Sequence, residues 1–274
     1  MPTLDTNKQH WEGYDWPQGG EEWSVAWGGS EFVWYAVLLP RLLRFLPASR
    51  ALEIAPGFGR WTQYLKELCD DLTVIDLAAQ CIEACQRRFA ESHHITYHVN
   101  DGLSLEAVPA KSIDFVFSYD SLVHAEAHVL RSYVRQLAEK LTPNGVGFIH
   151  HSNLAAIVPP TPGGPPADIH WRAHDMSAQL FVEYCAASGL RCITQEIVDW
   201  GGQRALDCFS VFTLPGSKFD RPLQVTETPT FMAEAERLKA ISQLYGAHTA
   251  AEAVATEPPP GVVARLARWL RARK

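Results

Sequence analysis

Two short apolar runs that each end in an acid constrain the fold of this chain most. The first run ends at Glu53 and the second at Asp76. Gly57 and Gly59 follow the first run, where glycine lets the backbone turn sharply off a strand and leaves room for a ligand. Asp76 stands where an acid can accept both hydroxyls of a ribose. The pattern predicts an α/β sheet that binds a nucleoside.

The spacing of the glycines differs from that of a dinucleotide-binding site. The fingerprint Gly-x-Gly-x-x-Gly requires a third glycine, and the chain has Thr62 at that position. The segment also lacks the lysine of a phosphate-binding P-loop. A pyrophosphate site is therefore poorly supported, and an NAD-dependent oxidoreductase is disfavoured.

Apolar segments alternate with helical patterns through the middle of the chain. This alternation predicts a doubly wound, mostly parallel sheet. The expected strands are residues 51–55, 72–76, 95–99, 114–118, 145–150, 191–200 and 207–214, and the helices between them are residues 61–69, 78–90, 129–141 and 178–188.

Four motifs in order resemble those of class I S-adenosylmethionine-dependent methyltransferases. Glu53 and the two glycines resemble the Glu-x-x-x-Gly-x-Gly motif, and residues 99–102 follow the third strand as in that family. Residues 114–124 resemble the fourth motif, whose loop flanks the methyl group, and residues 141–145 resemble the turn before the fifth strand. The resemblance implies a seven-stranded Rossmann-like sheet and S-adenosylmethionine as the cofactor.

The resemblance also assigns the cofactor contacts. Asp76 is expected on the ribose, Glu53 and Gly57 near the amino-acid end, and Asp101 near the adenine amino group. The full expected set is Glu53, Ala55, Gly57, Gly59, Asp76, Leu77, Asp101, Gly102, Ser118 and Tyr119.

Methyl transfer to a hydroxyl needs a base, and histidine suits this work near neutral pH, with an ordinary pKa of about 6–7. His124 ends the fourth-motif loop, a position similar to that of the catalytic histidine in plant phenolic O-methyltransferases. The alternative is that His124 caps the helix that starts near Glu126. His150 and His151 are further candidates, and because successive strand side chains point to opposite faces, at most one of them is expected to reach the substrate.

The acceptor is expected to meet aromatic and polar side chains from several loops. Tryptophan can stack on a sugar or aromatic ring, and arginine can hold a carboxylate or phosphate. The expected set is Trp27, Tyr119, Asp120, Asn153, His170, Trp171 and Arg172. We expect no metal, because magnesium prefers oxygen ligands and the one conceivable site is rich in nitrogen: Asp168, His170, His174 and His151.

The chain divides into three expected parts. Residues 1–46 are rich in tryptophan and glycine and predict a helical cap, which either packs on the core or closes as a lid over the site. Residues 47–215 form the methyltransferase domain, and residues 216–274 a helical extension. Within the extension, residues 262–274 predict a short basic amphipathic helix, which is favoured to be solvated and is too short for stable membrane anchoring.

Composition bounds the location and partners. A net charge of −7 and a pI near 5.9 argue against a general nucleic-acid binder. No apolar run is long enough to span a bilayer, residues 1–16 do not resemble a signal peptide, and the six cysteines lack paired C-x-x-C spacing. We therefore expect a cytoplasmic protein, and the residues leave open whether it forms a homo-oligomer.

The sequence predicts an S-adenosylmethionine-dependent methyltransferase that acts on a hydroxyl of a small acceptor. The segments WGG at residues 27–29, LEIAPGFGRW at 52–61 and HHSN at 150–153 resemble bacterial class I enzymes of glycan and natural-product pathways, which favours a sugar. An N-methyltransferase and a phenolic or polyketide O-methyltransferase remain alternatives. From another class, the alternative is a non-catalytic methyltransferase-fold module that binds a partner.

Overall fold

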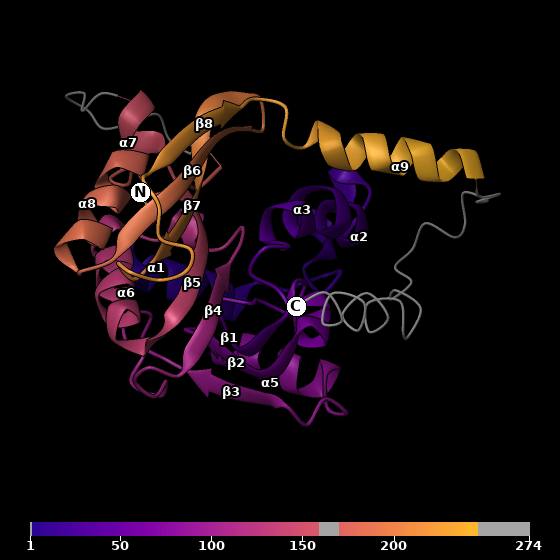
Figure 1. Ribbon diagram of the computed structural model, residues 1–274. Helices are drawn as coiled ribbons and strands as arrows, with labels where there is room; N and C mark the ends of the chain where they lie inside the picture. The colour runs from indigo at the N-terminus through magenta and orange to yellow at the C-terminus, as the bar shows by residue number, and fades with distance from the viewer. Residues whose placement is uncertain (1, 159–169, 246–274) are drawn as a thin grey trace.

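A computed structural model describes residues 2–158 and 170–245, which are built around one eight-stranded sheet (Figure 1). The strand order is β3-β2-β1-β4-β5-β7-β6-β8, and only β7 runs antiparallel to its neighbours. The strands are β1 (Ala48–Ile54), β2 (Cys69–Asp76), β3 (Ile95–Val99), β4 (Ile113–Ser118), β5 (Leu141–Ser152), β6 (Arg191–Trp200), β7 (Gln203–Thr213) and β8 (Gln224–Thr228).

The predicted fold class is confirmed, with one strand more than expected. All seven predicted strands are present, and β8 adds an eighth that pairs in parallel with β6 at the edge of the sheet. The sequence of β8, QVTET, is short and polar, and its residues are mostly exposed. An edge strand that buries neither face carries no apolar run, so the sequence pattern did not reveal it.

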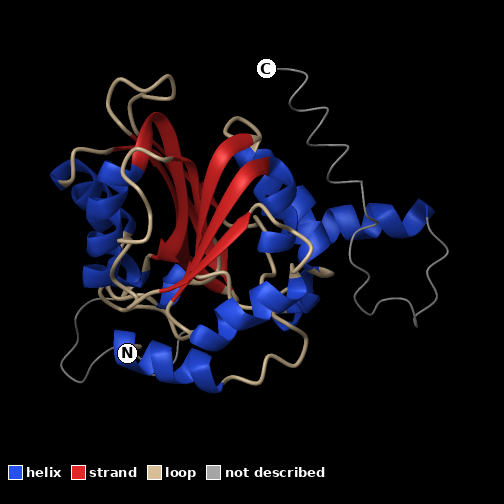
Figure 2. Ribbon diagram, turned by 90° about the horizontal axis from the view of Figure 1, so that it is seen from below, coloured by secondary structure: helices blue, strands red, loops and turns tan. Residues whose placement is uncertain are grey.

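Helices cover both faces of the sheet, as Figure 2 shows. Alternating side chains of β4 separate the two cores: Phe115 and Phe117 belong to one cluster, whereas Val116 belongs to the other. The helical elements are α1 (Leu4–Gly13), η1 (Glu21–Trp23), η2 (Val25–Trp27), α2 (Ser30–Phe32), η3 (Val33–Leu38), α3 (Leu39–Leu42), α4 (Thr62–Leu65), η4 (Lys66–Leu68), α5 (Ala79–Arg88), η5 (Leu122–His124), α6 (Ala127–Lys140), α7 (Leu154–Ile157), α8 (Ala178–Ala187) and α9 (Ala233–Tyr245).

The strand order reverses between β1 and β4. From β1 the chain continues outward through β2 and β3, whereas β4 leads in the other direction to β5. The loops that follow β1 and β4 therefore diverge and leave a crevice at the carboxyl ends of these strands, where open α/β sheets bind their ligands.

The N-terminal segment falls into two structural parts. Residues 30–42 pack into the core, where Trp34 is fully buried and stacks on Tyr64 at 5.1 Å. Helix α1 instead lies beside the crevice, held by hydrogen bonds from Asn7 Nδ2 to the carbonyl of His124 at 2.8 Å and from the Leu4 amide to a carboxylate oxygen of Glu126, also at 2.8 Å. Residues of the expected cap as far as Trp27 thus line the ligand region, whereas residues 30–42 belong to the core.

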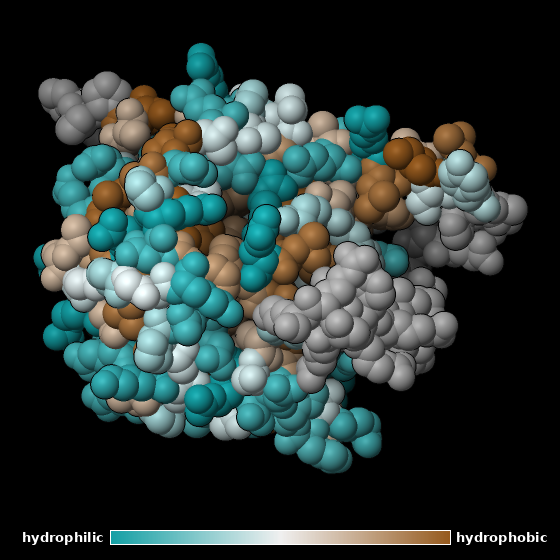
Figure 3. All heavy atoms as spheres, in the orientation of Figure 1, coloured by the Kyte–Doolittle hydropathy of each residue, from teal (hydrophilic) through white to brown (hydrophobic). Residues whose placement is uncertain are grey.

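The C-terminal extension is described as far as residue 245. Helix α9 is anchored near its start by buried Ala235 and by an ion pair between Glu234 and Arg41, whereas Leu244 near its end is 82% exposed. Figure 3 shows hydrophobic side chains on the described part of this helix. The predicted basic helix at residues 262–274 lies outside the described residues. No helix in the described ranges is both long and apolar enough to cross a membrane.

Candidate functional site

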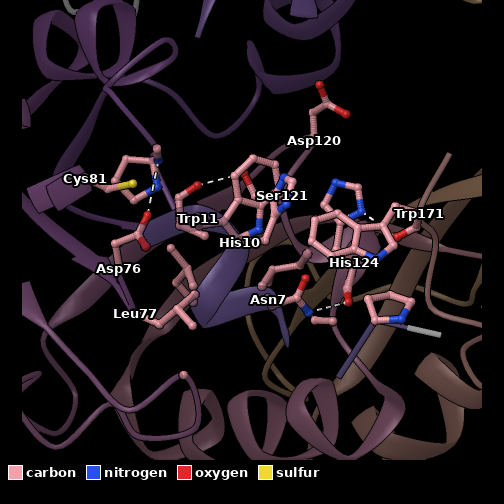
Figure 4. Close-up of a pocket in the computed structure, with 18 of the residues that line it drawn as sticks. Asn7, His10, Trp11, Asp76, Leu77, Cys81, Asp120, Ser121, His124 and Trp171 are labelled. Carbon is pink, nitrogen blue, oxygen red and sulfur yellow. Dashed lines mark hydrogen bonds between the residues drawn. The ribbon is translucent and has the colours of Figure 1, made fainter. Parts of the chain in front are cut away.

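A cavity of about 710 Å³ opens at the carboxyl ends of β1, β2 and β4. Figure 4 shows Asp76 and Leu77 on one side of it, His124 and Trp171 on the other, and side chains of α1 between them. The volume lies within the range of small-molecule sites. The walls come from α1, from the loops after β1 and β4, and from residues 170–174.

The first side of the cavity is the glycine loop after β1. Gly57 has a φ of +57° and donates its amide hydrogen bond to the Asp76 carboxylate at 3.2 Å. The amide of Ala78 also donates to Asp76, at 2.9 Å. Ala55 has a φ of +58°, and its carbonyl accepts a hydrogen bond from the Ser121 hydroxyl at 2.7 Å, which ties the loop after β1 to the loop after β4. The loop thus presents backbone and a carboxylate, as expected for a nucleoside site.

Two carboxyl groups at this end have no cation in close contact among the residues that the structure describes. Burial raises the pKa of Asp76 to about 7, although the amides of Ala78 and Gly57 oppose the shift. Burial also raises the pKa of Glu53 to about 8, and Glu53 accepts a hydrogen bond from the Thr62 hydroxyl at 2.6 Å. Ribose hydroxyls on Asp76 would supply donors to a carboxylate that is otherwise poorly solvated.

Half of the predicted cofactor residues line the cavity. They are Ala55, Gly57, Asp76, Leu77 and Gly102. Three of the other predicted residues are buried in the protein and do not line the cavity. Glu53 lies buried behind the loop, Ser118 is buried within β4, and Tyr119 packs against Trp61 and His150.

Two further predicted contacts are corrected by the geometry. A Cβ atom on Gly59 would lie 2.5 Å from the ring of Phe89, so this glycine permits packing against α5 and does not face the cavity. The Asp101 carboxylate accepts hydrogen bonds from the amides of Leu103 and Ser104 at 2.8 and 2.6 Å on the exposed side of the loop. The motif placed Asp101 in the right loop, but the turn directs its side chain into its own backbone.

His124 lies on the second side of the cavity, where its tautomer follows from its partner. Its Nδ1 atom is 2.7 Å from the carbonyl oxygen of Trp171. A carbonyl can only accept, so Nδ1 carries the proton and Nε2 keeps its lone pair. The histidine does not cap α6, because the amide of Ala127 at the start of that helix donates to Asp175 instead.

Burial, and then the charge of Arg172, lower the pKa of His124 to about 4. The expected pKa near 6–7 is therefore wrong. The imidazole is neutral at any physiological pH, and it is a weaker base than an exposed histidine.

His150 and His151 point to opposite faces of β5, as predicted, and neither lines the cavity. His151 stacks on Phe181 at 4.6 Å, and its Nε2 lies 2.8 Å from the hydroxyl of Ser210. His150 Nδ1 accepts a hydrogen bond from the amide of Asp120 at 3.1 Å. Both histidines are fully buried. The structure thus places them behind the cavity wall and not among the groups that can touch a substrate.

A paired set of charges forms part of the second side. Asp120 receives Arg60 Nη2 at 2.7 Å on one carboxylate oxygen, and its other oxygen lies 4.0 Å from Arg172 Nη2. Each guanidinium also lies over an indole ring, Arg60 over Trp61 at 4.6 Å and Arg172 over Trp200 at 5.0 Å. Stacking restricts the two arginines, so the carboxylate between them is firmly placed.

The structure brings together most of the predicted acceptor residues and adds others. Trp27, Asp120, His170, Trp171 and Arg172 line the cavity. Asn153 does not, because its side chain bonds the amide of Ala178 and the carbonyl of Ala205. Lining residues outside the predicted site set include Arg60, Trp61, Ser121 and Trp200, together with Asn7, His10, Trp11, Trp16 and Trp23 from the segment that was expected only as a cap or lid. Arg60 and Trp61 follow the glycine loop directly, which was a usable signal.

Several polar atoms on cavity residues are buried without a hydrogen-bond partner. They include the indole nitrogens of Trp16 and Trp61 and the amide oxygen of Asn7. Such atoms are costly unless a ligand or water satisfies them, which fits a cavity that holds a polar ligand. Among the residues that the structure describes, no group of three metal-ligating side chains gathers. Asp168, one member of the conceivable metal set, lies outside them.

Comparison with known proteins identifies the class of domain. Residues 51–145 match the family described as "Methyltransferase domain". The chain is 30% identical over 100 residues to nodulation protein S of Sinorhizobium fredii (strain NBRC 101917 / NGR234). The aligned region covers 36% of this chain and 45% of the relative. The chain thus spans less than half the length of this curated relative.

Two solved structures share the fold. The N-methyltransferase NodS from Bradyrhizobium japonicum, in complex with S-adenosyl-L-homocysteine, is 18% identical, with a TM-score of 0.54 over 76% of this chain and 98% of that one. A SAM-dependent methyltransferase from Leishmania major is 14% identical, with a TM-score of 0.58 over 77% and 82% of the two chains. Residues 51–145 thus match a methyltransferase domain, and the described fold is shared with solved S-adenosylmethionine-dependent methyltransferases.

Asp76→Ala tests the ribose contact. We expect the affinity for S-adenosylhomocysteine to fall by about 30- to 150-fold, equivalent to roughly 2–3 kcal/mol, because two hydroxyls lose a charged acceptor. Since the pKa of Asp76 is about 7 and the ribose hydroxyls favour the ionised form, wild-type affinity should rise from pH 5 to about pH 7 and then level off. Calorimetry measures both effects. Asp71→Ala, an exposed acid on the same strand, is the control, and a pH-dependent, undiminished affinity in Asp76→Ala would contradict the assignment.

Gly57→Val tests the cofactor loop. A Cβ atom there would lie 2.7 Å from the ring of Trp16, so we expect cofactor affinity to fall at least about tenfold, a loss of ~1.4 kcal/mol or more. Gly189→Val is a matched control, since Gly189 has a φ of +76° and no atom within 4 Å of its added Cβ. Both variants carry backbone strain of about 1–2 kcal/mol. Normal binding by folded Gly57→Val would show that this loop is not the cofactor loop.

Proposed function

We propose that this chain is an S-adenosylmethionine-dependent methyltransferase that methylates a hydroxyl of a small acceptor, with a sugar or glycosylated metabolite as the favoured class. The observation that carries the proposal is a single cavity with the Gly57–Asp76 loop on one side and His124 on the other. The proposed setting is the cytoplasm, and the proposed partner is a small molecule, with neither a nucleic acid nor a membrane as substrate.

The chemistry assigned to the residues is simple. The cofactor supplies an electrophilic methyl group on a sulfonium. With the cofactor bound, the carbon–oxygen bond would form as the methyl–sulfur bond breaks and a neutral thioether leaves. His124 would take the hydroxyl proton on Nε2, because the carbonyl of Trp171 holds the ring proton on Nδ1. Helix α1 and the tryptophans of the cavity wall exclude water, which would compete with the acceptor.

The polar groups beside His124 favour a neutral polyol. Asp120 keeps one oxygen that is 4.0 Å from Arg172 and can accept a hydrogen bond from a hydroxyl. Arg172 is paired with Asp207 at 2.7 Å and Arg60 with Asp120 at 2.7 Å, so neither guanidinium is left to neutralise an acid. The flat indole faces around the cavity suit stacking on a sugar ring. We therefore favour a neutral sugar over a uronic acid.

N-methylation is the second candidate. The Bradyrhizobium japonicum relative is named an N-methyltransferase, and the oxygen of Asp120 that faces Arg172 would equally accept an ammonium hydrogen. A neutral His124 would serve an amine as well as a hydroxyl, because an ammonium group must lose a proton before it can attack.

An acceptor panel distinguishes these candidates. We would incubate the protein with methyl-labelled S-adenosylmethionine and a neutral pyranoside, an aminopyranoside, a uronic acid and a catechol, and locate the label by NMR. The proposal expects label on oxygen of the neutral pyranoside at the highest rate and little transfer to the uronic acid. Label on nitrogen alone would establish the second candidate, and cofactor binding without transfer to any acceptor would favour a non-catalytic module.

His124→Ala tests the base. We expect turnover to fall by about 10²–10⁴-fold, the usual contribution of a positioned base, with cofactor affinity changed less than about twofold. In the wild type with saturating S-adenosylmethionine, turnover should stay level as pH falls to about 5 and then decline, because the pKa of His124 is about 4 and only the neutral ring accepts a proton. His128→Ala, an exposed histidine on α6, is the control. Full turnover in folded His124→Ala would reject the base assignment.

A further inference from the structure

Asp207 does not reach the cavity, yet two chains of contacts lead from it to the acceptor side. It lies on β7 and is completely buried, with 0% of its surface exposed. Its carboxylate contacts Arg172 and His150. We infer that Asp207 is a positioning residue that holds Asp120 and the hydrogen-bond partner of His124 in place. The inference rests on the proposed function, since it assumes that His124 acts on the acceptor.

The first chain of contacts runs through Arg172. Its Nε and Nη2 atoms donate to the two oxygens of Asp207 at 2.9 and 2.7 Å, a bidentate pair that sets the orientation of the guanidinium as well as its position. Arg172 Nη1 then donates to the carbonyl of His170 at 3.1 Å. Trp171, between these two residues, supplies the carbonyl that accepts from His124 Nδ1. The ion pair thus anchors the turn whose carbonyl selects the tautomer of His124.

That turn has an unfavourable backbone. His170 and Trp171 have φ values of +47° and +53°, and two successive residues with side chains rarely adopt the left-handed region. Such a conformation persists only where surrounding contacts impose it. The Arg172–Asp207 pair follows the turn directly and is buried on both sides, so it is placed to impose this conformation.

The second chain of contacts runs through His150. His150 Nδ1 accepts from the Asp120 amide at 3.1 Å, so its proton is on Nε2. Nε2 lies 3.1 Å from Asp207 Oδ2, a close polar contact that lacks the alignment of a hydrogen bond. Asp120 has a φ of +58°, another left-handed position, and its carboxylate receives Arg60. Asp207 therefore supports both loops that flank the acceptor, one through an arginine and one through a histidine.

Charge adds a measurable signature. Asp207 and Asp120 raise the pKa of His124, whereas Arg172 lowers it. Removing the negative charge of Asp207 should therefore lower the pKa of His124 further and move the acid side of the pH profile to lower pH. The charged and titratable groups on the cavity wall around His124 are His10 from α1, Arg60, Asp120, His170, Arg172 and His174.

The test is Asp207→Asn in the full chain, with Glu196→Gln as a matched control. Glu196 also forms a bidentate pair with an arginine, Arg41, at 2.7 Å for both contacts, but on the neighbouring strand and outside the cavity wall. We expect Asp207→Asn to reduce kcat on the order of 10²-fold, as a misplaced catalytic geometry does, with cofactor affinity within about twofold. Its pH profile should shift to lower pH. Glu196→Gln should lose stability alone, with kcat and pH profile unchanged.

A second measurement does not depend on turnover. In protein labelled with ¹⁵N at histidine, the ring nitrogens of His124 should report the Nδ1–H tautomer in the wild type and a mixed or inverted tautomer in Asp207→Asn, with His124→Asn used to assign the signal. If Asp207→Asn unfolds, Arg172→Lys keeps the charge but loses the bidentate pair, and it should show the same tautomer change. An unchanged tautomer and pH profile in a folded variant would overturn the inference. If the tautomer changes in Asp207→Asn but the wild type transfers no methyl group, the proposed function is rejected and the positioning role of Asp207 stands.

Discussion

The reversal of strand order between β1 and β4 is the constraint on which the rest of the site depends. Neighbouring strands of a parallel sheet satisfy each other's backbone hydrogen bonds, but where the chain leads away from two neighbouring strands in opposite directions, the loops that follow them separate. Gly57 in one loop and Asp120 in the other adopt left-handed conformations that open this crevice. Helix α1 then closes it, through contacts with the loop after β4 and with the start of α5. The strand-order reversal thus places the two loops between which the cavity lies.

The two sides of the cavity treat buried carboxylates differently. Asp76 has backbone amides but no close cation, so burial raises its pKa to about 7. Asp207 is equally buried, but Arg172 beside it holds its pKa well below the usual range. A carboxylate that lacks a protein cation is suited to receive donors from a ligand. A carboxylate that is fully paired is suited to fix the geometry of its neighbours. This difference separates ligand binding from structural support within one site.

His124 shows how geometry and acidity act together. The carbonyl of Trp171 directs the lone pair of Nε2, while burial keeps the ring neutral at physiological pH. If His124 is the base that we propose, the low pKa weakens it, and the fixed tautomer compensates by avoiding the reorientation that a free imidazole requires. The aromatic walls serve the same end, because the dry environment that lowers the pKa also excludes competing water.

Local sequence determined the strand–helix alternation, the glycine turn and the acid at the end of β2, since these features depend on short-range spacing and on the periodicity of apolar residues. It also separated His150 from His151 correctly, because strand side chains alternate between faces. What each face meets was decided by the tertiary structure: His150 lies against Asp120 and Asp207, and His151 against Phe181.

Several assignments required the folded chain for the same reason. Asp101 follows the expected strand, but its turn directs the carboxylate into local backbone amides. Asp207 lies in the middle of a strand that reads as ordinary core, and nothing in its neighbours along the chain indicates that Arg172 and His150 meet it. Spacing along a chain determines which way a residue faces. The side chains that contact the residue come from segments that are distant in the sequence, and only the packing of the folded chain brings these segments together.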